Sequence, residues 1–204
     1  MKDTRICFVG DSFVNGTGDP TYLGWVGRVC QPWPQLTVYN LGVRRETSLD
    51  IKQRWQQETE RRWGQGCDRR LVFSFGANDM TLESGRCRVD LEASIACARQ
   101  ILIQAQRQAA IAVLMIGPPP VADDPDHAQR IVALCDRYAQ LCRKLKVAYL
   151  PTARALLQSP IWRQEASQGD GAHPAAGGYA ALAQLVLDWP HWQLWLQGSE
   201  RAAP

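Results

Sequence analysis

Short runs of hydrophobic residues, many of them β-branched or aromatic, recur along the chain and alternate with longer segments of mixed polarity. Such short runs, bounded by glycine, proline or polar residues, are typical of β-strands. Because the runs are nearly continuous rather than alternating, they predict strands covered on both faces, as in a parallel sheet. The predicted strands are residues 5–9, 37–41, 71–75, 111–116 and 147–150.

The segments between these runs have the spacing of amphipathic helices. In one of them, apolar side chains recur at intervals of four, three and four residues, which places them on one helix face. This stripe consists of Leu134, Tyr138, Leu141 and Leu145. Residues 47–50 resemble a capping box, and Pro174 suits the first turn of a helix. The predicted helices are residues 22–30, 48–63, 88–108, 128–146 and 174–187.

Strands that alternate with helices form βαβ units, and the crossovers between parallel strands are right-handed. The sequence therefore predicts an α/β fold, a flavodoxin-like three-layer α/β/α sandwich with about five parallel strands. We expect residues 1–188 to form one domain. A tryptophan-rich tail, residues 189–204, is predicted to pack on this domain, with self-association or contact with a membrane surface as alternatives.

Composition narrows the class of protein. Of 204 residues, 46% are hydrophobic and 21% charged, and the formal net charge is +3. These values exclude disorder, collagen and coiled coil, and they predict no nucleic-acid surface. The seven cysteines form no C-x-x-C pair, which predicts free thiols and no structural zinc.

The same features indicate a location. Free thiols are typical of a reducing compartment, and too few apolar residues precede Gly10 to form the core of a signal peptide. The weakly polar stretch 109–122 is too short, and too rich in proline, to span a membrane. We therefore expect a cytoplasmic protein without stable membrane insertion.

In an open α/β sheet, ligands bind at the carboxyl ends of the strands. The residues that follow the predicted strands, and a loop before the last helix, supply a serine, an amide, a histidine and a carboxylate. They are Ser12, Gly42, Asn78, Asp170 and His173. A hydroxyl nucleophile, an imidazole base, a carboxylate that orients this base and N–H donors for an oxyanion are the components of acyl transfer.

These residues stand in four blocks that resemble the SGNH hydrolases, also called GDSL esterases or lipases. The blocks are residues 8–18, 40–43, 76–79 and 170–174, in the order that the family has. The resemblance implies that Ser12 is the nucleophile, that His173 is the general base and then acid, and that Asp170 orients His173. It also implies an oxyanion hole made by the N–H groups of Ser12 and Gly42 and the side-chain amide of Asn78.

The second block departs from the family pattern, because Arg45 stands where another glycine is common, three positions after Gly42. Arg44 and Arg45 are candidates to line the substrate pocket and to favour an anionic group. The alternative is that both are solvated or paired with Glu46 or Asp50. Pro119 lies in the proline-rich segment 117–127, which we expect to form a stiff loop that contributes to acyl-chain selection.

Other candidates have a structural explanation. Asp11 and Asp79 are expected to bind loop amides, and the acidic residues 123–126 suit the start of a helix better than a metal site. The sequence therefore predicts a serine esterase without metal or cofactor, which cleaves carboxylic esters or thioesters of small molecules through an acyl-enzyme.

Two alternatives stay open at this point. A carbohydrate O-acetylesterase would use the same catalytic residues with a shallower, more polar pocket. A non-catalytic module that binds phosphate or nucleotide on a flavodoxin-like scaffold would leave Asn78, Asp170 and His173 without a purpose. Self-association of the chain, if it occurs, is expected through the tryptophan-rich tail.

Overall fold

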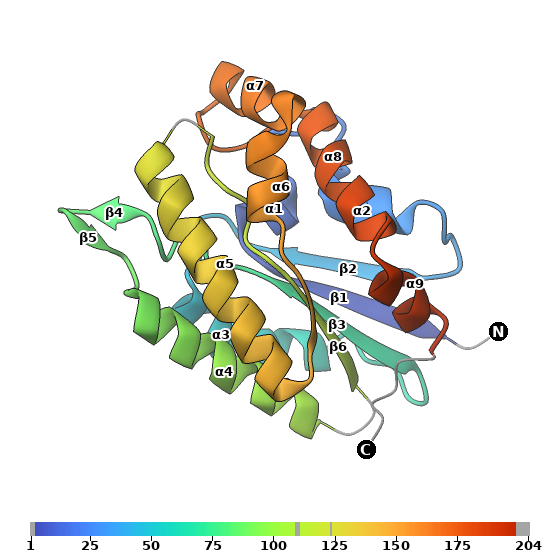
Figure 1. The fold of residues 1–204 in the computed structure, drawn as a ribbon. Helices are drawn as coiled ribbons and strands as arrows, with labels where there is room; N and C mark the ends of the chain where they lie inside the picture. The colour runs from blue at the N-terminus through green and yellow to red at the C-terminus, as the bar shows by residue number, and fades with distance from the viewer. Residues whose placement is uncertain (1–2, 109–110, 123, 199–204) are drawn as a thin grey trace.

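The computed structural model describes residues 3–108, 111–122 and 124–198, and its centre is a sheet of five parallel strands (Figure 1). The strands are β1 (Thr4–Gly10), β2 (Thr37–Gly42), β3 (Asp68–Ser74), β6 (Ile111–Ile116) and β7 (Ala148–Leu150). They lie in the order β2-β1-β3-β6-β7, which is the flavodoxin-like order. The prediction of an α/β fold with a five-stranded parallel sheet is confirmed.

Helices cover both faces of this sheet. On one face, α3 (Ser48–Glu60), α4 (Leu91–Arg107) and α5 (Pro125–Leu145) lie side by side. On the other face, α2 (Gly24–Cys30) packs against α8 (Ala176–Leu187), and α9 (Pro190–Leu196) follows α8 (Figure 1). The chain moves toward one edge of the sheet from β1 to β2 and toward the opposite edge in the connections after β2. Because the crossovers are right-handed, the helices of these two kinds of connection lie on opposite faces.

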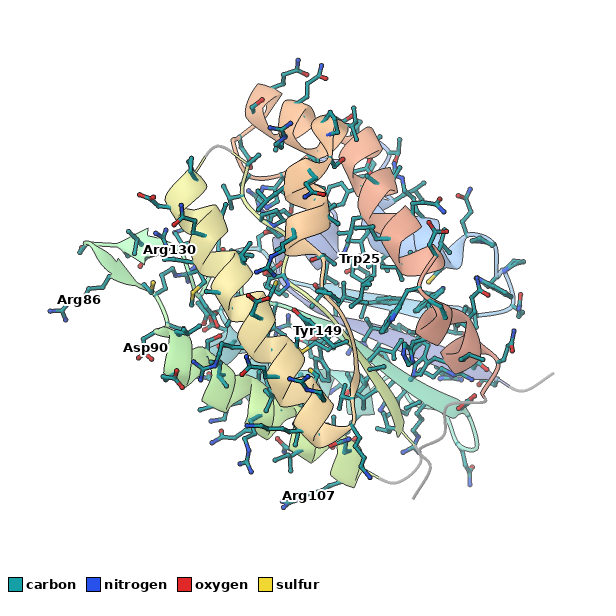
Figure 2. The ribbon with its side chains drawn as sticks, in the orientation of Figure 1. Trp25, Arg86, Asp90, Arg107, Arg130 and Tyr149 are labelled. Carbon is teal, nitrogen blue, oxygen red and sulfur yellow. The ribbon has the colours of Figure 1, made fainter. Side chains whose placement is uncertain are left out.

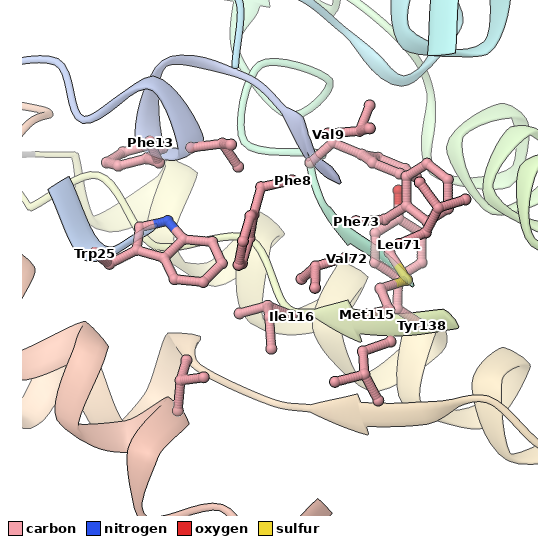
Figure 3. Close-up of a cluster of buried hydrophobic side chains, with 14 of the residues drawn as sticks. Phe8, Val9, Phe13, Trp25, Leu71, Val72, Phe73, Met115, Ile116 and Tyr138 are labelled. Carbon is pink, nitrogen blue, oxygen red and sulfur yellow. The ribbon is translucent and has the colours of Figure 1, made fainter. Parts of the chain in front are cut away.

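The core explains why the strand sequences are continuously apolar. Phe8 of β1 packs edge to face on Trp25 of α2, with ring centroids 5.5 Å apart, and Figure 3 shows these two rings together. On the other face, Phe73 of β3 meets Trp55 of α3 at the same centroid distance. All four rings are fully buried. Both faces of the sheet are therefore lined by aromatic contacts, which contribute packing energy beyond the area that they bury.

The described part of the tryptophan-rich tail forms α9. Trp192 and Trp195 are buried and stack on each other at 5.4 Å. The guanidinium of Arg70, at the start of β3, lies 5.1 Å from the ring of Trp195 and also binds Asp68. These two indoles are thus covered by the chain itself. Residues 199–204 of the tail lie outside the described residues.

Several short elements were not predicted. They are α1 (Ser12–Asn15), the hairpin of β4 (Leu82–Glu83) and β5 (Arg86–Cys87), α6 (Ala153–Gln158) and α7 (Pro160–Gln168). Figure 2 shows that Arg86 projects from the hairpin into solvent. The start of α4 was predicted three residues too early, because the side chain of Asp90 accepts the N–H of Ala93 and caps the helix there. The start of α5 was predicted three residues too late, since Asp124 is its cap and Pro125 its first residue.

None of the helices in the described part of the chain has the length and apolar character needed to cross a membrane. The histidine, cysteine and acidic side chains of the described residues form no group of three or more that could hold a metal ion. Asp123 of the acidic segment lies outside the described residues.

Candidate active site

Ser12 stands two positions after the last residue of β1, at the first position of the short helix α1. Asp11 caps this helix, because its Oδ1 accepts the N–H of Phe13 at 3.0 Å. Ser12 is nearly buried, and its own N–H has no hydrogen-bond partner among the described residues. The turn is tight, since a Cβ on Gly10 would collide with the carbonyl of Ser74 on the neighbouring strand. The strand thus presents a hydroxyl and a free N–H together.

His173 and Asp170 reach this serine from the loop between α7 and α8. His173 Nε2 lies 2.7 Å from Ser12 Oγ, and His173 Nδ1 lies 2.7 Å from Asp170 Oδ2. Both distances are those of hydrogen bonds, so the three side chains form one continuous hydrogen-bonded series. A hydroxyl, an imidazole and a carboxylate in this order can move a proton from the hydroxyl to the imidazole while the carboxylate holds the ring.

The other oxygen of Asp170 fixes the loop. Asp170 Oδ1 accepts the N–H of Ala172 at 3.0 Å and the N–H of His173 at 2.8 Å. Burial by itself would raise the pKa of Asp170, but the N–H groups of His173 and Ala172 and the ring of His173 lower this pKa to about 2. Asp170 is therefore ionised at neutral pH, as an orienting carboxylate requires.

Two contacts hold the histidine loop in place. Glu165 of α7 accepts the N–H groups of Gly177 and Gly178 at 3.1 and 2.6 Å, which anchors the first turn of α8. On the other side, Gly18 packs on His173 so closely that a Cβ there would lie 3.2 Å from the Cβ of His173. The position of His173 is therefore set by α7, α8 and the segment after α1.

Asn78 lies in the loop after β3 and is held from several directions. Its Nδ2 donates to the carbonyl of Glu46 at 2.9 Å, which occupies one of the two N–H bonds of the amide. The preceding carbonyl, of Ala77, is 2.9 Å from the ring Nε2 of His127. The carboxylate of Asp79 accepts the N–H of Ser48 at 2.7 Å and the hydroxyl of Ser94 at 2.5 Å. This loop is thus bonded to α3, α4 and α5, and one amide N–H of Asn78 stays available.

This constellation agrees with a comparison of whole sequences. A sequence model of the GDSL-like lipase/acylhydrolase family matches residues 8–181, a range that contains both Ser12 and His173. The chain belongs to this family. It is a serine hydrolase of ester bonds. No curated protein is significantly similar to the sequence.

Solved structures of an acetylxylan esterase and of a lipase/acylhydrolase have the same fold. The acetylxylan esterase Axe2 from Geobacillus stearothermophilus is 18% identical, with a TM-score of 0.71, and the match covers 91% of this chain and 93% of that one. A lipase/acylhydrolase from Enterococcus faecalis is 23% identical, with a TM-score of 0.72, and the match covers 90% and 93%. At these identities the likeness concerns the fold, and the confirmed family assignment rests on the sequence match.

In this GDSL-like chain, the packing of β2 on α1 requires a glycine at position 42. A Cβ on Gly42 would collide with the main-chain N of Asn15, so the missing side chain lets β2 approach α1 closely. The N–H of Gly42 donates to Asn40 Oδ1 at 3.0 Å. Asn40 Nδ2 in turn donates to the carbonyl of Val14 at 2.8 Å. Asn40 therefore ties the end of β2 to the nucleophile helix.

The arginine that replaces the usual glycine keeps the conformation that favours glycine. Arg45 has φ 67°, in the left-handed region, within a turn in which the N–H of Glu46 meets the carbonyl of Val43 at 3.5 Å. Its guanidinium is exposed and lies 4.0 Å from Glu83 of the hairpin. Arg44 is exposed and has no ion pair within the described residues. Glu46 binds Arg54 and Asp50 binds Thr47, so the structure shows neither carboxylate paired with these arginines. Both arginines are exposed, as in the alternative that they are solvated.

The proline-rich segment differs from its prediction in part. Residues 117–122 form a loop, but His127 belongs to α5, and Pro119 is buried. The loop is fixed from behind, since Thr152 Oγ1 donates to the carbonyl of Gly117 at 2.8 Å and Trp162 Nε1 to that of Pro120 at 3.1 Å. The segment is therefore stiff, as expected.

Sequence reasoning missed the contact of Asn40 with Gly42 and the contact of His127 with Ala77, the neighbour of Asn78. Asn40 offered a weak signal, as the first residue of the second block.

Proposed function

We propose that Ser12, His173 and Asp170 are the catalytic triad of this ester hydrolase. The observation that carries the proposal is the continuous hydrogen-bonded chain from Ser12 Oγ through both ring nitrogens of His173 to Asp170, with two links of 2.7 Å. The free N–H of Ser12 and the anchored amide of Asn78 add donors beside the nucleophile. Membership of the family removes the alternative of a non-catalytic phosphate-binding module.

The proposed reaction has two stages. Ser12 Oγ attacks the ester carbonyl carbon while its proton passes to His173 Nε2, and the negative charge collects on the carbonyl oxygen. The intermediate collapses as the alcohol or thiol leaves with the proton from Nε2, and the acyl group stays on Ser12. Water then attacks this acyl-enzyme while His173 Nε2 takes its proton. The bond between the acyl carbon and Ser12 Oγ breaks, Oγ recovers the proton from Nε2, and the carboxylic acid is released. Asp170 stays ionised and accepts the Nδ1–H of His173 in both stages.

The proposed oxyanion hole contains the N–H of Ser12 and the second N–H of the Asn78 amide. Gly42 is the third proposed donor. Its N–H donates to Asn40 Oδ1, so it contributes only if this hydrogen bond breaks when substrate binds. The N–H of Arg45 is the alternative third donor, because it has no hydrogen-bond partner among the described residues. Arg45 precedes Glu46, whose carbonyl accepts the amide N–H of Asn78. Donors fixed before the reaction stabilise the developing charge without reorganisation.

The proposed substrate is a small carboxylic ester or thioester. Arg44 is an exposed cation without an ion pair in the described part of the chain, which supports its proposed contact with a polar or anionic group of the substrate. Arg45 and Pro119 stay proposed lining residues. A carbohydrate O-acetylesterase is the second candidate, supported by the fold that the chain shares with an acetylxylan esterase.

All seven cysteines are free thiols, which supports a reducing, cytoplasmic compartment. We propose one domain for residues 1–188, no metal or cofactor, and no nucleic-acid partner. Self-association through residues 189–204 stays a prediction. Leu194 of α9 is an exposed apolar side chain that could form such a contact.

The test is hydrolysis of p-nitrophenyl esters from acetate to palmitate, with a chelator present, by the wild type and by Ser12→Ala. We expect turnover that ignores the chelator and disappears in the variant, and a fluorophosphonate that labels Ser12 alone. Full activity of Ser12→Ala would disprove the assignment of the nucleophile. Turnover of acetyl esters only, with faster release of acetate from acetylated oligosaccharides, would select the carbohydrate esterase.

A further inference from the structure

Arg54 of α3 extends to the carboxyl ends of two neighbouring strands. Its Nη2 donates to the carbonyl of Gly10 at 3.1 Å and to the carbonyl of Leu41 at 2.9 Å. Gly10 is the last residue of β1, two positions before Ser12, and Leu41 lies next to the end of β2. Only 16% of the Arg54 side chain is exposed, so a single guanidinium joins the ends of β1 and β2 behind the nucleophile.

The other nitrogens of Arg54 bind acidic side chains. Nε donates to Glu46 Oε2 at 2.6 Å, and Nη1 donates to Glu58 Oε2 at 3.1 Å. Glu46 is also the residue whose main-chain carbonyl holds the amide of Asn78. Arg54 is therefore bonded both to the strand that leads into Ser12 and to the turn that fixes Asn78.

This arrangement needs an arginine. The planar guanidinium directs five N–H bonds in a fixed fork, whereas the three N–H bonds of a lysine originate at one atom. Four acceptors from four separate parts of the chain surround the group here. Anchoring α3 does not require it, because Ile51 and Trp55 already bury this helix in the core. A buried ion pair is in addition a poor way to gain stability over an apolar side chain of similar size.

We infer that Arg54 is a positioning residue for ester hydrolysis, which sets the distance between the N–H of Ser12 and the amide of Asn78. The inference rests on the proposed oxyanion hole. Donors of an oxyanion hole act only where they meet the charge that develops on one oxygen, so a displacement of either donor lowers kcat more than it changes KM. A residue that touches neither substrate nor nucleophile then affects the rate through Asn78.

The test is a comparison of Arg54→Lys in two backgrounds, with p-nitrophenyl acetate as substrate. In the otherwise unchanged enzyme, we expect Arg54→Lys to lower kcat by about 10- to 100-fold while KM changes by less than about threefold. In an Asn78→Ala background, the same change should lower kcat by less than about fivefold, since interacting residues are not additive. Equal losses in the two backgrounds, or no loss in the first, would overturn the inference.

Arg70 provides the matched control. It is also a buried arginine with an ion pair, to Asp68 at 2.7 Å, but it lies at the start of β3, away from the carboxyl ends of the strands. We expect Arg70→Lys to lower the melting temperature and to leave kcat within about twofold, because buried ion pairs affect folding wherever they lie. A loss of kcat equal to that of Arg54→Lys would mean general destabilisation and would refute the positioning role.

Two further measurements separate the possible failures. If Arg54→Lys does not fold, Glu46→Gln takes its place in the test. This variant keeps the main-chain contact to Asn78 and removes the charged partner of Arg54, so it should also lower kcat. An unchanged kcat of folded Glu46→Gln in that case would overturn the inference. If Ser12→Ala stays active, the proposed function itself is wrong. If Ser12→Ala is inactive while Arg54→Lys equals the wild type, only the positioning role is refuted.

Discussion

The ring of Phe13 lies 4.8 Å from the imidazole of His173, measured between centroids, with the two planes inclined by 42°. Phe13 is buried and packs in turn on Trp162 at 5.9 Å, so its ring cannot move away from the histidine. In the proposed reaction His173 becomes a cation, and an aromatic face stabilises a cation by about 0.5–1 kcal/mol.

Phe13→Leu should therefore reduce kcat by about two- to fivefold, because the imidazolium loses the aromatic face while the apolar contact is mostly retained. The measurement is steady-state turnover of p-nitrophenyl acetate beside Phe13→Tyr, which keeps the ring. Equal activity of the leucine variant and the wild type would show that the ring only fills space.

Asp170→Asn should lower kcat by about 10³–10⁴-fold. The amide can keep the two main-chain hydrogen bonds from Ala172 and His173, so the loop should retain its shape. Its NH₂ group, however, would face Nδ1 and favour the ring tautomer that carries a proton on Nε2, where the serine proton must go. Turnover and melting temperature should be measured together, and a loss below tenfold in a folded variant would contradict the orienting role.

Gly42→Ala should reduce both stability and activity, since the added methyl collides with the main chain of α1. Overpacking of this kind costs about 1–3 kcal/mol, and here it also displaces the helix that carries Ser12. Gly27→Ala on α2 is the control, because its Cβ meets only side-chain atoms of Leu23, at 3.1 Å and beyond, and no main-chain atom of another element. Urea unfolding should separate the two variants, and equal stability would mean that β2 can yield.

Asp11 predicts a pH dependence of folding. Burial, and then the nearby carboxylate of Asp79, raise its pKa to about 7, although the N–H of Phe13 opposes this shift. A carboxyl with a raised pKa in the folded state binds more protons there than in the unfolded chain. Its contribution therefore makes the free energy of unfolding fall as the pH rises from about 4 to about 7.

Asp11→Asn should remove this contribution while keeping the cap on α1. We expect the stability of the variant, relative to the wild type, to increase steadily between about pH 4 and pH 7 and then to level off. Urea unfolding of both proteins at several pH values measures this difference, in which the other titrating groups largely cancel. A difference that does not change with pH would mean that Asp11 has an ordinary pKa.

Sequence reasoning found what is encoded by continuous apolar runs and by motif residues at strand ends. It placed the strands of the main sheet and brought Ser12, Asn78 and His173 to the same edge. It failed where polar residues take part in packing. β3 begins three residues before its predicted start, because Asp68 and Arg70 bind each other and Arg70 lies on Trp195.

The short elements escaped for a related reason. Strands of two residues, such as β4 and β5, have no periodicity to detect. The environments of Gly42 and Arg45 depend on the path of the main chain rather than on residue type. Arg54 binds residues of β1, of β2 and of the turn after β2, which come close to its side chain only when the chain folds. Sequence spacing cannot reveal them.

Ser12 and His173 are separated by 161 positions in the sequence. The serine follows the first strand of the sheet, whereas the histidine precedes α8, whose first turn is fastened by Glu165. A ribosome that releases these segments in order would complete the nucleophile early and its base only after α8 has emerged and docked. Ester hydrolysis is therefore a direct assay of complete folding. A nascent chain in which every strand has formed, but α8 has not docked, would not hydrolyse esters.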